Sequence, residues 1–225
     1  MKGRLAMNEN AVRGSFVSPT FAAYIQSTGR CDPNRNFRNL PLEDLEDVVC
    51  ALLNPKRVKH VLGCRDTAVE LAHRWGANEI DAARAGLLHD ITKVFDGPAQ
   101  LTLAQEYGIM LDDFSQANPK TLHALTGAYV AREMFGENDA VFHAIESHTT
   151  GKANMNMLET IIYVADYMEP NRDFPGVENL RYLTTVNMKQ ALQCGLEMTL
   201  EHLKEQGARV SPASREALEY LYNQK

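Results

Sequence analysis

The fold of this chain is indicated first by residues 85–93, which read AGLLHDITK. Small and aliphatic residues lead to a histidine and an aspartate, His89 and Asp90, that follow each other directly. Neighbouring residues on a helix point about 100° apart, so the pair can present two ligand atoms to one point inside a helical bundle. A carboxylate buried there without a partner is costly, and a metal ion or a cationic side chain removes that cost. By itself the dipeptide is a weak indication, because His-Asp also occurs by chance.

Further histidines and one more carboxylate lie in other apolar segments of helical character. His60 is one segment upstream, His123 precedes a run of small residues, His148 ends an apolar run, and Asp166 interrupts an aliphatic one. Helical bundles commonly build inward-facing metal sites from one such residue per helix. We therefore expect a metal site made of His60, His89, Asp90, His123, His148 and Asp166. This mixed set of imidazoles and carboxylates suits iron, manganese, cobalt or zinc rather than calcium.

Apolar residues recur at helical spacing from residue 41 onward, and prolines, asparagines and glycines mark the ends of the segments. No run shows the alternation of a strand, so the sequence predicts an all-α protein. We expect residues 1–40 to form an irregular N-terminal extension that docks through the apolar patch 21–25, followed by one domain over 41–225. The expected helices lie at about 42–53, 55–75, 78–91, 98–108, 121–135, 138–147, 155–169, 179–206 with a break near 187, and 212–222.

Composition narrows the class of protein. The 225 residues are 44% hydrophobic and 23% charged, which is enough apolar side chain for an ordinary core. A formal net charge of -6 argues against a nucleic-acid binder, although a bound metal would still admit a small anionic substrate. No apolar run is long enough for a membrane span, and no signal peptide is recognisable at the N-terminus. The four cysteines form no CxxC pair and are expected to be reduced thiols, so we expect a cytoplasmic protein.

Longer strings around the six expected ligands resemble the HD-domain phosphohydrolase superfamily, and within it the YqeK branch of symmetrical dinucleoside tetraphosphate hydrolases. The order H…HD…H…H…D is typical of the superfamily as a whole. The branch is indicated by KRxxHxxG at 56–63, AGLLHDxxK at 85–93, HxxxGAY at 123–129, HTTG at 148–151 and ADYMEPNRDFPGV at 165–177. The string DYxEPNR is the most specific part, and the resemblance covers roughly residues 42–225.

The resemblance implies an HD-domain helical bundle with the metal site in its core. The primary metal ligands would be His60, His89, Asp90 and Asp166, which leaves His123 and His148. Those two histidines would complete a second metal position, with Asp90 able to bridge the two. In this branch the metal would be iron, and the centre would be dinuclear.

The reaction that the resemblance implies is hydrolysis of diadenosine tetraphosphate to two ADP by a metal-activated water. Asp90 and Lys93 would be the catalytic residues, with Lys93 also placed as a point charge on phosphate oxygens. Two arginines could make forked contacts to phosphate. Thr149 and the segment Arg209 to Ser214 would approach the nucleotide. The expected substrate-binding residues are Arg57, Lys93, Thr149, Arg172 and the segment Arg209 to Ser214, which includes Ser211.

Other interpretations stay open at this point. Lys93 could be only a cation near a helix C-terminus, and Arg172 could stiffen its loop by pairing with an acidic neighbour. A different HD-type nucleotide phosphohydrolase or phosphodiesterase is the first functional alternative. The Gly-Tyr-Pro element of the cyclic dinucleotide branch is missing from this sequence. A non-catalytic nucleotide sensor on the same fold is the second alternative, against which the intact ligand set argues. The oligomeric state is left open, a homodimer included.

Overall fold

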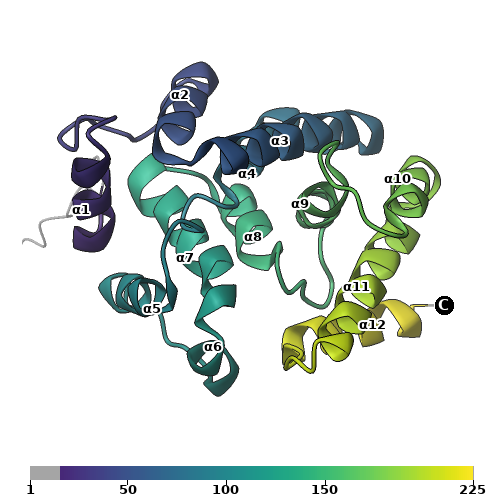
Figure 1. The fold of residues 1–225 in the computed structure, drawn as a ribbon. Helices are drawn as coiled ribbons and strands as arrows, with labels where there is room; N and C mark the ends of the chain where they lie inside the picture. Colours follow the sequence, from purple (N-terminus) through teal and green to yellow (C-terminus); the bar gives the residue numbers. More distant parts are fainter. Residues whose placement is uncertain (1–15, 225) are drawn as a thin grey trace, which may run out of the picture.

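The structure is a computed structural model that describes residues 16–224. Within that range every regular element is a helix, so the all-α prediction is confirmed. Figure 1 shows the helices wrapped around a central group, with the C-terminal helices gathered at one side. The helices are α1 Pro19–Thr28, α2 Leu42–Leu52, α3 Pro55–Trp75, α4 Glu79–Leu88, α5 Gly97–Glu106, α6 Asp113–Ala117, η1 Pro119–Thr121, α7 Leu122–Val130, η2 Ala131–Phe135, α8 Asp139–Ser147, α9 Met157–Met168, α10 Val177–Val186, α11 Met188–Glu205 and α12 Pro212–Asn223.

Local capping explains why several helix ends could be predicted. The side chain of Asn54 accepts the backbone N–H of Arg57, a proline occupies the first turn of α3, and Gly76 ends that helix at φ 71°. Asn78 caps α4 in the same way. At the start of α9, Asn156 forms a capping box with Glu159. These signals are local in sequence, so they survive without knowledge of the tertiary fold.

The centre of the bundle is formed by α3, α4, α7, α8 and α9. Helix α3 packs against α4 and α9, α4 also packs against α8 and α9, and α7 packs against α8. The α3–α4 approach is close at Gly86, where an added Cβ would lie 2.7 Å from Cα of Arg65. A larger residue there would push the two helices apart. The close pairing holds the end of α4, and with it the His-Asp pair, against the middle of α3.

Residues 19–28 correct the expectation of an irregular N-terminal extension. They form helix α1, which begins at the cap Ser18 and ends at Gly29 in the left-handed conformation. Phe21 and Ile25 are fully buried, and α1 packs against α5. The apolar patch at 21–25 thus packs against the rest of the protein, as expected, but it does so as part of a helix. Residues 1–15 lie outside the described residues, and the domain boundary at residue 40 stays a prediction.

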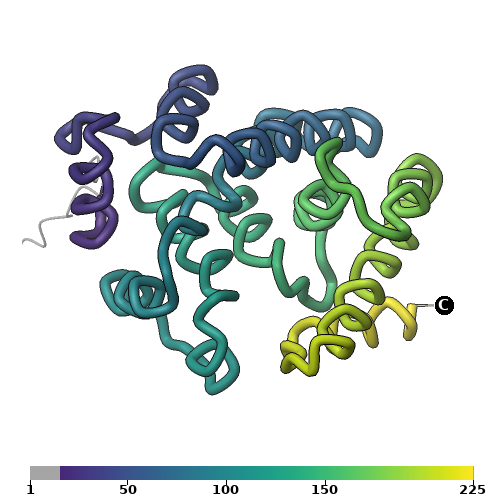
Figure 2. Tube along the Cα trace, viewed as in Figure 1, coloured from purple at the N-terminus to yellow at the C-terminus, as the bar shows by residue number. Residues whose placement is uncertain are grey.

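The C-terminal part forms a second layer beside α9. The expected break near residue 187 is confirmed, because Asn187 separates α10 from α11. Helix α11 packs against α9, α10 and α12, as the traced chain in Figure 2 lets the reader follow. The short elements α6 and η1 were not predicted, since five and three residues are too few to show a helical period. The four cysteines are free, as expected, and no described helix is long and apolar enough to cross a membrane.

Candidate metal centre

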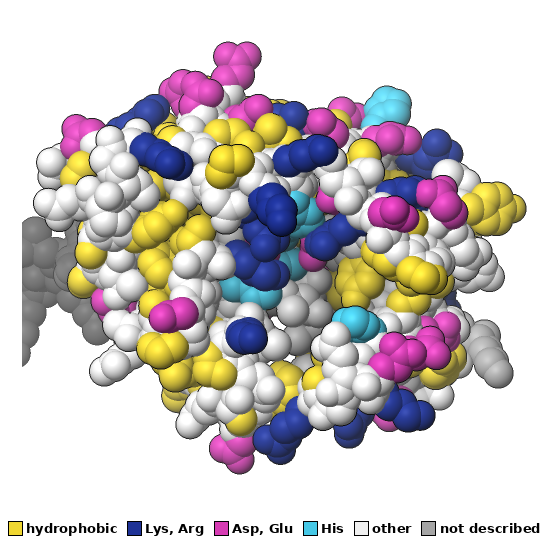
Figure 3. Space-filling model, viewed as in Figure 1, with side chains coloured by type: hydrophobic (Ala, Val, Ile, Leu, Met, Phe, Trp, Pro, Cys, Tyr) yellow, Lys and Arg dark blue, Asp and Glu magenta, His cyan; other side chains and the backbone are white. Residues whose placement is uncertain are grey.

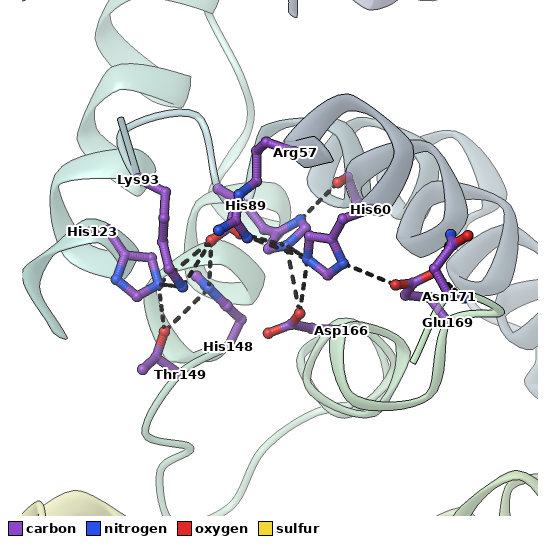
Figure 4. A network of polar contacts seen from close by, with 12 residues as sticks. Arg57, His60, His89, Lys93, His123, His148, Thr149, Asp166, Glu169 and Asn171 are labelled. Atoms are coloured by element: carbon purple, nitrogen blue, oxygen red, sulfur yellow. Dashed lines mark hydrogen bonds and ion pairs between the residues drawn. The ribbon is translucent and has the colours of Figure 1, made fainter. Parts of the chain in front are cut away.

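The six expected ligands meet at one place in the middle of the bundle. Figure 4 shows the side chains of His60, His89, His123, His148 and Asp166 pointing toward one another. His60 lies within α3 and Asp166 within α9. His123 lies in the first turn of α7, whereas His89 and His148 are the C-terminal caps of α4 and α8. Most of the cluster is buried, so its polar groups have little access to bulk water.

One part of the cluster joins α3, α4 and α9. Nε2 of His60 lies 3.0 Å from Oδ1 of Asp166 and 3.6 Å from Oδ2 of Asp90. Nε2 of His89 lies 3.3 Å from Nε2 of His60 and 3.6 Å from the same Asp90 oxygen. His60, His89 and Asp90 offer ligand atoms within 4.8 Å of one another, which is compact enough to hold one metal ion.

The other part of the cluster surrounds the second oxygen of Asp90. Oδ1 lies 3.5 Å from Nε2 of His123 and 3.7 Å from Nε2 of His148. These three residues form another group that could hold a metal ion. The two carboxylate oxygens of Asp90 therefore face different groups of histidines, which is the arrangement that a bridging ligand needs.

Asp90 also provides a test of whether a cation fits. Its side chain is 1% exposed, yet Oδ1 has no hydrogen-bond partner among the described residues. Nζ of Lys93 is 3.3 Å from this oxygen without hydrogen-bond geometry. A buried acceptor left unpaired is rare and costly. The histidines and carboxylates around it are a ligand set of the kind that first-row transition metals accept, so the residues fit a metal ion at this place.

The backbone orients three of the four histidines in the same way. Nδ1 donates to a carbonyl three residues earlier, from His89 to Gly86 at 2.8 Å, from His123 to Lys120 at 2.7 Å, and from His148 to Ile145 at 2.7 Å. A carbonyl can only accept, so Nδ1 of each ring must carry the proton. Each Nε2 is then left with its lone pair directed into the cluster.

Burial also keeps two of these imidazoles in the neutral form. Burial lowers the pKa of His89 to about 4 and that of His123 to about 3, with Lys93 adding to the effect at His123. Both rings are therefore neutral near pH 7, which is the form that binds a metal. Burial opposes the ionisation of Asp90, but His89 and Lys93 hold its pKa well below the usual range. The site therefore combines neutral imidazoles at His89 and His123 with an ionised carboxylate at Asp90.

Three cationic side chains lie at the rim of the cluster. Arg57 contacts Oδ2 of Asp90, Nζ of Lys93 lies 2.9 Å from Nε2 of His123, and Nη2 of Arg172 lies 2.6 Å from Oδ1 of Asp166. Their side chains are 30%, 35% and 39% exposed, so each can also reach a ligand from solvent. Figure 3 shows Lys and Arg gathered around a hollow in which histidine is visible. Arg172 pairs with Asp166 and lies 4.0 Å from Glu169, rather than pairing with Asp173.

A cavity of about 470 Å³ opens beside the cluster, here called the first cavity. Thr149, whose Oγ1 is 3.0 Å from Nε2 of His123, lines it together with Arg209 and Ser211. Lys93 and Asp166 lie at the same cavity. The structure thus brings the expected nucleotide-contacting residues, from the segment after α8 and from the α11–α12 loop, to one place. Arg57 and Arg172 approach the cluster without lining this cavity.

Glu169 was missed in the sequence analysis, although it belongs to the motif at 165–177. Its Oε1 lies 3.1 Å from Nδ1 of His60. In the other three histidines of the cluster, Nδ1 donates to a backbone carbonyl instead. Oε2 accepts both the backbone and the side-chain N–H of Asn171, each at 2.7 Å. Glu169 is 1% exposed. Its position three residues after Asp166, near the end of the helix, was the only signal in the sequence.

The other three histidines, His73, His143 and His202, lie outside the metal cluster, and their side chains are exposed. His73 pairs with Glu79 and His143 with Glu146. His202 also borders the first cavity.

Comparison with known proteins agrees with this geometry. The model of the HD domain family matches residues 57–171. The chain is 38% identical to a "Bis(5'-nucleosyl)-tetraphosphatase, symmetrical" of Halalkalibacterium halodurans over 161 residues, which are 71% of this chain and 86% of that protein. It is 37% identical to the protein of the same name from Bacillus subtilis, with the same coverage. A crystal structure from Clostridium acetobutylicum, described as a predicted HD superfamily hydrolase involved in NAD metabolism, matches with a TM-score of 0.80 and 36% identity, covering 83% of this chain and 99% of that one.

Proposed function

The chain belongs to the HD domain family, and from that premise we propose that it hydrolyses diadenosine tetraphosphate symmetrically to two molecules of ADP. The observation that carries the proposal is the unpaired buried oxygen of Asp90 within a cluster of four histidines and a second carboxylate. The names of the relatives from Halalkalibacterium halodurans and Bacillus subtilis indicate the substrate and the symmetrical cut.

We propose that the cluster holds two metal ions. His60, His89, Asp90 and Asp166 would hold one, and Asp90 would share the other with His123 and His148. Iron is the proposed metal, and manganese, cobalt and zinc suit the same ligand set. Metal ions in such a site lower the pKa of water, which supplies a nucleophile near neutral pH, and neutralise phosphate charge.

The chain's own residues would bind and orient the polyphosphate. Lys93 offers a compact positive charge beside Asp90, and Arg57 and Arg172 offer planar forks that suit phosphate oxygens. These three cations now neutralise ligand carboxylates, so they stand next to the place where a phosphate chain would meet the metals. In the first cavity, Thr149 and the segment from Arg209 to Ser214, which includes Ser211, would contact the nucleotide. This assignment makes Asp90 and Lys93 the catalytic residues.

The test is incubation of purified, iron-loaded protein with diadenosine tetraphosphate and separation of the products. ADP as the only nucleotide product supports the proposal. Equal amounts of ATP and AMP would contradict the symmetrical cut and favour another HD-type phosphohydrolase. Absence of turnover in metal-replete protein would favour a nucleotide sensor. The Asp90→Ala protein, prepared in parallel, reports any contaminating phosphatase.

A further inference from the structure

A cavity of about 650 Å³ lies next to the first one and is here called the second cavity. It is lined by residues of the α9–α10 loop and of α11, and it shares Tyr167 and His202 with the first cavity. Arg172 lines it and donates to Asp166, which lines the first cavity. Both cavities therefore border the α9 end of the metal cluster. Apart from Arg172, none of the described residues that line the second cavity has a role in the proposed function.

The inner wall of the second cavity is apolar and aromatic. The rings of Tyr167 and Phe174 meet edge to face, with centroids 6.1 Å apart. Met198 lies on the same wall, and its methyl group approaches Gly176 closely enough that a Cβ there would lie 3.1 Å away. Tyr167 is held in place by its hydroxyl, which lies 2.5 Å from Oγ1 of Thr199. An aromatic wall with a fixed ring and a methionine suits a flat heteroaromatic group such as a nucleobase.

The outer wall has the opposite character. Glu201 and Glu205 line the cavity one helical turn apart on α11, and both are exposed. Neither forms an ion pair or a hydrogen bond with another described residue. Two free carboxylates repel a phosphate group, but they accept hydrogen bonds from the hydroxyls of a ribose or from an amino group on a base. Among the described residues that line this cavity, Arg172, next to the metal cluster, is the one lysine or arginine.

The two cavities therefore differ in charge. Lys93, Lys120 and Arg209 line the first cavity, so it can take phosphates together with a nucleoside. The second can take a nucleoside whose phosphates lead toward Arg172. A substrate with identical nucleosides at both ends, cut in the middle, needs a separate place for each end beside the metals. A volume near 650 Å³ lies within the usual range for small-molecule sites.

Resting on the proposed function, we propose that the second cavity is the binding subsite for the second nucleoside of the dinucleoside polyphosphate. The wall of Tyr167, Phe174 and Met198 receives the base, Glu201 and Glu205 accept from its ribose or amino group, and Arg172 takes the adjoining phosphate. The symmetrical cut then follows from the occupation of both cavities by one substrate. Each half of the substrate becomes one ADP, held in its own cavity.

The test is the stoichiometry of ADP binding to the metal-loaded protein, measured by equilibrium dialysis up to millimolar ADP. The expected result is two ADP per chain in the unmodified protein and one in Phe174→Ala. The double variant Glu201→Gln, Glu205→Gln lies on the surface and does not endanger the fold. We expect it to bind the second ADP about tenfold more weakly, as loss of charged acceptors would cause. The matched control Tyr182→Ala, which removes an aromatic ring that is 63% exposed on α10, should keep both sites.

The proposal is overturned if the unmodified protein binds a single ADP or none. It is also overturned if both cavity variants keep two ADP sites of unchanged affinity. Turnover of diadenosine tetraphosphate is measured on the same samples. Two ADP sites without turnover would contradict the proposed hydrolysis but support the second subsite. Turnover with one ADP site would support the hydrolysis and contradict the second subsite. If Phe174→Ala fails to fold, the affinity of the Glu201→Gln, Glu205→Gln variant for the second ADP tests the proposal.

Discussion

Oε1 of Glu169 lies 3.1 Å from Nδ1 of His60, the ring nitrogen on the far side of the imidazole from the metal cluster. Burial lowers the pKa of His60, but its bonds to Asp166 and Glu169 outweigh burial and raise the pKa above the usual value. The other three histidines of the cluster are oriented by backbone carbonyls three residues earlier in the chain. His60 depends instead on a carboxylate more than a hundred residues away in the sequence, and Asn171 holds that carboxylate in place.

Glu169→Gln should therefore weaken metal binding without removing a ligand. A carboxylate behind a histidine fixes the ring and makes it a stronger donor, and its loss typically costs 10 to 100-fold in metal affinity. Metal retention during dialysis against graded chelator, measured by elemental analysis, checks this. The control Glu216→Gln alters an exposed glutamate on α12 and should retain metal like the unmodified protein. Equal retention in both variants would remove Glu169 from the metal centre.

Asp90→Ala should abolish metal retention and activity together. It removes the one side chain whose two oxygens face both groups of histidines. The measurement is metal per chain after purification without chelators, alongside turnover of diadenosine tetraphosphate. Asp139→Ala, at the exposed start of α8, is the matched control and should keep its metal. A full metal complement in Asp90→Ala would show that this carboxylate is not a ligand.

Lys93→Ala should leave the metal content unchanged and lower turnover about a hundredfold, as removal of one transition-state donor commonly does. Its amino group lies 3.3 Å from Oδ1 of Asp90, so it adds positive charge at the cluster without being able to bind a metal itself. Elemental analysis and steady-state rates on one preparation separate the two effects. Loss of the metal in this variant would mean that Lys93 serves the cluster rather than the phosphate.

Ile25→Ala should destabilise the whole protein by about 2–5 kcal/mol, because it leaves a cavity under helix α1. Ile25 is fully buried, in a segment that the sequence analysis expected to be irregular. Urea unfolding followed by circular dichroism measures the change in the free energy of unfolding. Gln26→Ala changes the exposed neighbour and should shift that energy by less than about 0.5 kcal/mol. An equal, small effect of both substitutions would show that α1 does not belong to the folded core.

Gly86→Ala should cost about 1–3 kcal/mol in the free energy of unfolding, because the new methyl group would overlap the backbone of α3. The overlap is with Cα of Arg65, at 2.7 Å, and backbone cannot move aside cheaply. Since the carbonyl of Gly86 orients His89, we also expect weaker metal retention. Gly127→Ala is the control on a neighbouring helix, where the nearest atom would be at an ordinary 3.4 Å. If the two substitutions prove equally mild, the α3–α4 contact tolerates more space than the structure implies.

The sequence by itself determined the helices of the bundle and the six side chains of its centre. Helical period, asparagine caps and glycine ends act within a few residues, so they can be recognised along the chain. The six side chains were singled out because a histidine or a carboxylate inside an apolar segment needs a partner, and because their order resembled that of a known family. The short helix α6 and the helical state of residues 19–28 escaped prediction, since the first is too brief for a period and the second depends on burial against α5.

Only the tertiary structure decided which atoms face one another. The two oxygens of Asp90 meet different histidines because α3, α7 and α8 approach the end of α4 from different sides. Glu169 finds His60, and the second cavity forms between a loop and α11, through packing of segments that are distant in the chain. The physical reason is that such contacts depend on how helices pack and how side chains turn, which local sequence signals do not contain.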